Sequence, residues 1–219
     1  MKVVISASLG HFQRPGNPGE PSTYPIIPPT AVAGVIDSIY WHPGHTVQVR
    51  SIGLINPIEY TTETVTQLDH TNGASWLRTY ELLVNPAFLV DFWLECASGV
   101  DVNKRVGLLC RRLQSGQHYQ QPCMGLSDFP AAVRLLAKDE TPPPVIDIDM
   151  PIGPMPHYWQ WRSVNKPGKK PFVRRTSSIA DERPLQHSEG RAMFFDARLV
   201  GGIVSVPNYP VRGEDGYAA

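Results

Sequence analysis

The chain has 219 residues, of which 42% are hydrophobic, and its 20 Lys and Arg residues balance 20 Asp and Glu residues. A chain of this length can bury its own core, and its lack of net charge excludes a protein that attracts nucleic acid by overall charge alone. The 22 Pro and 18 Gly residues favour turns and short elements, which argues against an all-α fold.

The first 138 residues predict strands and helices in the order βαββαβ. Strands are indicated by β-branched, alternating or apolar segments at 2–8, 45–60, 77–95 and 131–137, with Pro86 interrupting the third. Helices are indicated by apolar residues at three- and four-residue spacing from Thr30, the expected N-cap, to just before Pro43, and from about Val102 to Ser115. Gly116 is the expected stop of the second helix. This order predicts an α+β, ferredoxin-like domain.

The rest of the chain predicts a small β-rich region. Two strand-like runs around Gly201–Gly202 predict a hairpin, and the polar, basic segment 163–190 predicts a mobile loop. We therefore expect a ferredoxin-like domain at 1–138 and a β-rich extension at 139–219. No apolar run is long enough to cross a bilayer and the first residues lack a signal-like apolar core, so we expect a cytoplasmic protein with no membrane partner.

The sequence lacks a phosphate-binding glycine loop and the common hydrolase, zinc-protease and kinase motifs. Two basic stretches remain, one on the second predicted helix and one at 162–175, beside Tyr158, Trp159 and Trp161. Aromatic and cationic side chains together stack bases and bind phosphates, but the same pattern fits core aromatics beside a solvated loop. We interpret His42 and His45 as loop histidines rather than metal ligands.

Three segments resemble the CRISPR-associated Cas5 family in its subtype I-C form. They are YPIIPPTAVAGVIDSIYWHP at 24–43, LINPIEYT at 54–61 and RRLQSGQHYQQPCMGLSDFPA at 111–131, and MFFDARLVGGIVSVP at 193–207 looks like the closing hairpin of that family. The resemblance implies a RAMP-type, RRM-like protein that cleaves the CRISPR repeat transcript without a metal or other cofactor. It also implies that the protein keeps the 5′ handle of the guide RNA and assembles with the large and backbone subunits of a Cascade-like complex. Contacts with target DNA near the protospacer-adjacent motif stay open.

The resemblance also assigns catalytic positions. The family's tyrosine falls on Tyr40 and its lysine on Lys104, whereas the family's histidine is replaced by Arg105. Metal-free RNA cleavage needs a base for the 2′-hydroxyl, a cation for the phosphate and a donor for the leaving oxygen. An arginine supplies the cation but stays protonated and cannot act as the base. His118 is the first candidate to replace the histidine, ahead of His42 or His45.

Binding of the RNA is expected from polar and basic side chains on three segments. They are Arg14, Arg111, Arg112, Gln117, Lys169, Lys170, Arg174 and Arg175. The chain departs from the family after the second strand, where Thr61 and Thr62 stand in place of arginines. Two other functions stay open: a handle-binding structural subunit of a Cascade complex without nuclease activity, and an unrelated small enzyme.

Overall fold

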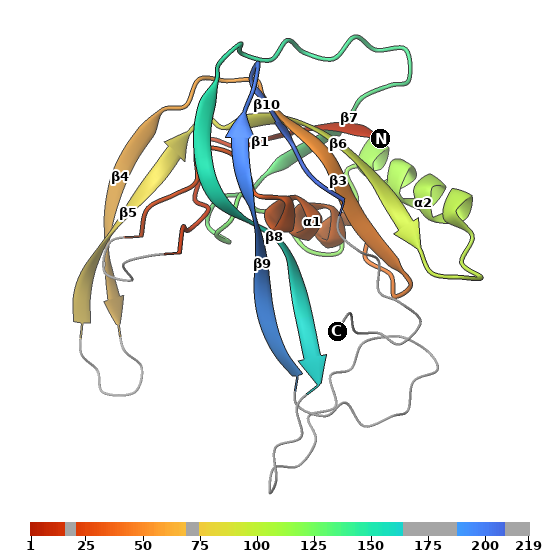
Figure 1. Cartoon of the computed structure of the whole chain (residues 1–219), viewed down its shortest axis with the longest axis horizontal. Coiled ribbons are helices and arrows are strands. Elements are labelled where there is room, and N and C mark those ends of the chain that lie inside the picture. Colours follow the sequence, from red (N-terminus) through yellow and green to blue (C-terminus); the bar gives the residue numbers. More distant parts are fainter. Residues whose placement is uncertain (16–20, 69–74, 164–187, 209–219) are drawn as a thin grey trace, which may run out of the picture.

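The computed structural model in Figure 1 describes residues 1–15, 21–68, 75–163 and 188–208. Within these ranges the elements are, in chain order, β1 (Lys2–Ser6), β2 (Leu9–Gly10), α1 (Pro29–Ile39), β3 (His45–Leu54), β4 (Tyr60–Leu68), β5 (Ser75–Val84), β6 (Ala87–Cys96), α2 (Val102–Ser115), β7 (Ala132–Leu135), β8 (Met150–Ser163), β9 (Ser188–Leu199) and β10 (Ile203–Ser205). In this part of the chain, no helix is long and apolar enough to span a membrane.

The main sheet confirms the expected α+β fold. Its five strands lie in the order β10-β3-β6-β1-β7, and every neighbouring pair is antiparallel. Without β10, the order places the second, third, first and fourth strands of a βαββαβ unit side by side, which is the ferredoxin-like arrangement. The closing strand expected at 131–137 is β7, paired with β1.

A second sheet has three strands in the order β2-β5-β4. Its main part is the β4–β5 hairpin, which lies between β3 and β6 in the chain. The prediction of one strand at 45–60 was wrong, because β3 ends at Leu54 and β4 begins at Tyr60 after a turn through Pro57. After Tyr60, β4 continues Thr-Thr-Glu-Thr with every residue exposed, so it lacks the apolar alternation that predicts strands. The break at Pro86 is confirmed.

The two helices begin differently. α1 starts at Pro29 with no side-chain cap, so the expected Thr30 cap is wrong: Thr30 lies inside the first turn, and the proline at the helix start needs no partner for an N–H group. α2 is capped by Asp101, whose Oδ1 accepts hydrogen bonds from the Asn103 and Lys104 amides at 2.9 and 3.2 Å. It ends at Gly116, in a left-handed conformation with φ of 68°, as predicted.

The predicted hairpin near the end of the chain is confirmed at its turn, where Val200 and Ile203 pair and exchange backbone hydrogen bonds of 3.0 and 3.1 Å. Gly201 and Gly202 between them have φ angles of 55° and 75°. Beyond this pair the two strands diverge, because β9 pairs with β8 while β10 joins the edge of β3 in the main sheet. The β8–β9 ribbon packs on α1 and extends beyond the sheet (Figure 1).

The hydrophobic core continues across the expected boundary between residues 138 and 139. Met155 of β8, Leu199 of β9 and Val204 of β10 lie in the same buried cluster as Val3 of β1 and Ile36 of α1. The division into two domains stays a prediction. Only the ends of the basic loop expected at 163–190 belong to the described residues. Its residues 164–187, which include Lys169, Lys170, Arg174 and Arg175, lie outside them.

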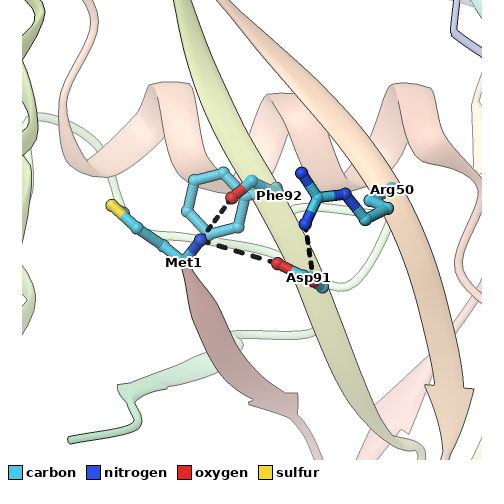
Figure 2. A network of polar contacts seen from close by, with 4 residues as sticks. All are labelled: Met1, Arg50, Asp91 and Phe92. Carbon is cyan, nitrogen blue, oxygen red and sulfur yellow. Dashed lines mark hydrogen bonds and ion pairs between the residues drawn. The ribbon is translucent and has the colours of Figure 1, made fainter. Parts of the chain in front are cut away.

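A polar network fixes β1 against the neighbouring strands at the middle of the main sheet (Figure 2). The Met1 ammonium donates to the Phe92 carbonyl at 2.6 Å and lies 3.5 Å from an Asp91 carboxylate oxygen. Arg50 of β3 lies 3.4 Å from the other Asp91 oxygen. Because the Arg50 side chain is exposed, that ion pair contributes little to stability, and the half-buried ammonium is the more constrained contact.

Candidate active site

Tyr40 lies where α1 ends and forms the centre of a cluster that joins both helices to β3. It is the C-cap residue of α1, and its amide donates to the Ile36 carbonyl at 3.0 Å. Its side chain is only 6% exposed. Arg105 of α2 donates from Nη1 to the Tyr40 hydroxyl oxygen at 3.0 Å. The fold thus brings together two of the predicted catalytic positions, which are 65 residues apart in the chain.

Arg112 also binds the end of α1. Its Nη1 donates to the Ile39 carbonyl at 2.7 Å, and its guanidinium carbon lies 5.2 Å from the centroid of the Tyr40 ring. Arg112 is a predicted RNA-binding residue, and in the structure it donates to the carbonyl of the last residue of α1 and contacts the face of Tyr40. Its side chain is half-buried.

The basic residues of α2 form two rows along the helix. Arg105 and Arg112 are seven residues apart and therefore share the face that contacts Tyr40. Lys104 and Arg111 are also seven residues apart, one position earlier, and both are exposed. The first row positions protein groups, and the second presents positive charge to solvent.

His45, at the start of β3, stacks on Tyr40. The ring centroids are 5.4 Å apart with an interplanar angle of 29°, and the His42 ring is 6.3 Å from His45 on a further near-parallel plane. Burial, the charge of His42 and the charge of Arg105 lower the pKa of His45, with the Tyr40 backbone opposing them. His45 is therefore neutral at pH 7.

His118 and Gln117 lie beside this cluster on a pocket of about 190 Å³. Ile39 and Arg112 line the same pocket, so Arg112 connects it to the Tyr40 ring. The loop that carries the pocket is bound to α1, because the amides of Tyr119 and Gln120 donate to the Ser38 carbonyl at 2.8 and 2.9 Å. His118 and Gln117 are both exposed.

Arg14 occupies a different part of the molecule. Its Nε donates to the Thr23 carbonyl at 3.2 Å, and its guanidinium carbon lies 4.9 Å from the Tyr24 ring. Tyr24 in turn donates to the Pro154 carbonyl of β8 at 2.5 Å. Burial raises the pKa of Tyr24 and the Arg14 charge partly opposes this. Arg14 therefore binds the Thr23–Tyr24 segment, which in turn contacts the β8–β9 ribbon.

No group of three or more His, Cys, Asp or Glu side chains forms a metal-binding cluster within the described ranges. The sequence ranked His45 below His118 as a replacement for the family's histidine, yet the ring against Tyr40 is that of His45. The sequence signal that pointed to it was its position just after the Pro43–Gly44 turn that follows Tyr40.

The antiparallel sheet with its two helices defines the class of protein, an α+β protein of the ferredoxin-like type. A family model described as CRISPR-associated protein (Cas_Cas5), in its Cas5d form, matches residues 2–203. The chain belongs to this Cas5d family, which is the subtype I-C form of Cas5.

Two curated relatives cover nearly the whole chain. The CRISPR pre-crRNA endoribonuclease Cas5d of Mannheimia succiniciproducens is 26% identical over 235 residues, 95% of each chain. The protein of the same name from Thermus thermophilus is 26% identical over 220 residues, 94% of this chain and 91% of its own.

Two solved structures share the fold. A functionally uncharacterized protein from Streptococcus mutans has a TM-score of 0.61 at 15% identity, and a structure described as a CRISPR-associated protein has a TM-score of 0.62 at 18% identity. Each similarity covers 94% of this chain and 91% of the other.

Proposed function

We propose that the chain is a pre-crRNA endoribonuclease that cleaves the CRISPR repeat transcript without a metal and retains the 5′ handle of the guide RNA. The names of both curated relatives support the activity. The observation that carries the proposal is the 3.0 Å hydrogen bond from Arg105 to the Tyr40 hydroxyl. It unites on one site two positions to which the family resemblance assigns catalysis.

The direction of this hydrogen bond defines what Tyr40 can do. Because a guanidinium only donates, the Tyr40 oxygen is the acceptor and its own O–H stays available to donate. In metal-free cleavage the 2′-oxygen bonds to the adjacent phosphorus while the bond to the 5′-oxygen breaks. We assign Tyr40 the role of donor to the phosphate or to the leaving 5′-oxygen, and Arg105 the role of orienting it.

The two remaining roles fall on exposed side chains. Lys104 supplies the cation for the charge that develops on the phosphate. His118, on the pocket that Arg112 lines, is the proposed acceptor of the 2′-hydroxyl proton, because histidine is the side chain that most often acts as a general base.

The proposed partners follow from this role. The exposed row of Lys104 and Arg111, together with Gln117, is the proposed RNA surface on the described part of the chain. Assembly with the large and backbone subunits of a Cascade-like complex, a cytoplasmic location and target-DNA contacts near the protospacer-adjacent motif stay predictions.

The test is cleavage of a labelled repeat hairpin by the purified protein in EDTA. Wild type is expected to make a single cut at the base of the hairpin, and Lys104→Ala is expected to lose about 100-fold in rate, because it removes charge stabilisation of the transition state. Lys138→Ala is the matched control, since Lys138 is an exposed lysine of the loop after β7. Cleavage that disappears in EDTA, or a Lys104→Ala variant as fast as the control, contradicts the proposal.

A second candidate is a handle-binding subunit without nuclease activity. Two observations favour it: Arg105 occupies the position of the family's histidine, and Tyr40 is only 6% exposed. Binding of the repeat RNA without a cut in the same assay identifies this function, and the processing enzyme is then another protein.

The two neighbouring arginines of α2 are expected to behave differently. Arg111→Ala is expected to weaken repeat-RNA binding and to reduce the slope of log K against log salt by about 1, because it removes one phosphate contact. Arg112→Ala is expected to lower thermal stability in addition to RNA affinity, because the Ile39 carbonyl loses its hydrogen-bond donor. Affinity at several salt concentrations and thermal unfolding of both variants test this. Identical behaviour of the two variants contradicts the separation into two rows.

A further inference from the structure

His45 has no role in the proposed cleavage reaction, yet its ring is placed in an unusual environment beside Tyr40. Both of its ring nitrogens, Nδ1 and Nε2, are buried and have no hydrogen-bond partner among the described residues. Histidine nitrogens in such a position are usually paired. Both nitrogens of the ring are buried while its face lies on Tyr40, so the contribution that the geometry supports is to hold Tyr40.

The groups around His45 come from every element packed against it. Tyr40 faces it from the end of α1, and His42 from the turn, with the His42 Nδ1 hydrogen-bonded to the Pro43 carbonyl. Cys96 of β6 is its partner across the sheet, and Arg105 approaches from α2. The charges that act on His45, those of His42 and Arg105, are both positive. Cys96 is not a compensating anion, because burial raises its pKa.

We propose that His45 is a positioning residue of the cleavage site, which holds Tyr40 in its productive orientation only while the His45 imidazole is neutral. This inference rests on the proposed function of the chain. A proton on His45 places a half-buried cation near the positive charges of Arg105 and His42, and the Tyr40 backbone only partly offsets their repulsion. The strain is relieved when the ring turns out to solvent, and this movement removes the stack on Tyr40 and weakens its hydrogen bond to Arg105.

Protonation of His45 is therefore expected to reduce RNA cleavage at acidic pH, in addition to any effect of pH on the other catalytic groups. The burial and charges described above lower the pKa of His45, so the loss lies below the ordinary histidine value of about 6.5. One pH unit below the midpoint, the neutral fraction of His45 falls about tenfold.

The test compares single-turnover cleavage, at saturating protein, between wild type and His45→Phe from pH 4.5 to 8. Phenylalanine keeps an aromatic ring against Tyr40 but cannot take a proton. The ratio of the His45→Phe rate to the wild-type rate is expected to be constant above pH 7 and to rise about tenfold per pH unit below the midpoint. Effects of pH on His118 or on the RNA cancel in this ratio. A ratio that stays constant over the whole range overturns the proposal.

His42→Gln is the matched variant, because it removes a neighbouring charge and leaves the stack on Tyr40 in place. It is expected to raise the midpoint, since His42 is one of the groups that lower the pKa of His45. An unchanged midpoint contradicts the proposed electrostatic coupling. His45→Gln repeats the comparison if His45→Phe does not fold.

A readout without cleavage separates this inference from the proposed function. If wild type cuts no RNA at any pH, the proposed function fails, and the His45 inference is then judged by NMR. The imidazole resonance that is missing in His45→Phe is expected to titrate below pH 6.5, and the Tyr40 ring resonances are expected to shift with the same midpoint. Tyr40 resonances that do not follow this titration overturn the positioning role.

Discussion

Replacement of Tyr40 with phenylalanine is expected to slow cleavage of repeat RNA about 100- to 1,000-fold, the usual effect of removing one transition-state donor. The substitution removes only the hydroxyl. The ring that stacks on His45 and contacts Arg112 is kept, so RNA affinity is expected to stay close to wild type and the protein to fold, with stability lower by about 1–2 kcal/mol because Arg105 loses its acceptor. Single-turnover cleavage, RNA binding and thermal unfolding of the same preparation measure the three quantities.

Tyr119→Phe is the matched control for this substitution. Tyr119 lies in the loop after α2 and is 77% exposed, so loss of its hydroxyl changes neither the site nor the core. A Tyr40→Phe variant that cuts at the wild-type rate removes Tyr40 from the catalytic site. A variant that loses folding together with activity makes the Arg105–Tyr40 hydrogen bond a structural contact between the helices.

The sequence predicted the elements whose local residue pattern is typical of the structure that they adopt in the fold. α2 combines apolar periodicity with a glycine stop, and the closing strand β7 follows an apolar segment, so both were found. β4 was missed because it is an edge strand with exposed threonines, whose stability comes from pairing with β5. The pairing of β10 with β3 depends on contacts more than 140 residues apart, which no local pattern encodes.

The site was predictable in its residues and only partly in its geometry. Spacing alone separates Arg105 and Arg112 from Lys104 and Arg111 on the helix surface. The contact of His45 with Tyr40 depends on the intervening turn, in which Gly44 has a φ angle of 89° and directs β3 back past the end of α1. A local sequence pattern does not specify which rings such a turn brings together.

Gly125→Ala is expected to destabilise the protein by about 3 kcal/mol or more, through backbone strain and overpacking. Gly125 has a φ angle of 91°, and a Cβ atom there would lie 1.8 Å from the His11 carbonyl oxygen. The backbone has little room to yield, because the His11 amide donates to the Met124 carbonyl at 3.0 Å and Met124 is fully buried. At this chain length, we expect the melting temperature to fall by about 10 °C.

Gly107→Ala tests whether this loss comes from the site of Gly125 rather than from the loss of any glycine. Gly107 lies in the interior of α2, and an added Cβ atom meets nothing within 4 Å. Alanine is expected to stabilise the helix there by about 0.5–1 kcal/mol. Opposite signs for the two variants in thermal unfolding identify Gly125, the last residue of the GQHYQQPCMG segment, as a packing residue that holds the pocket loop against the sheet. A Gly125→Ala variant as stable as wild type contradicts the close approach of this loop to His11.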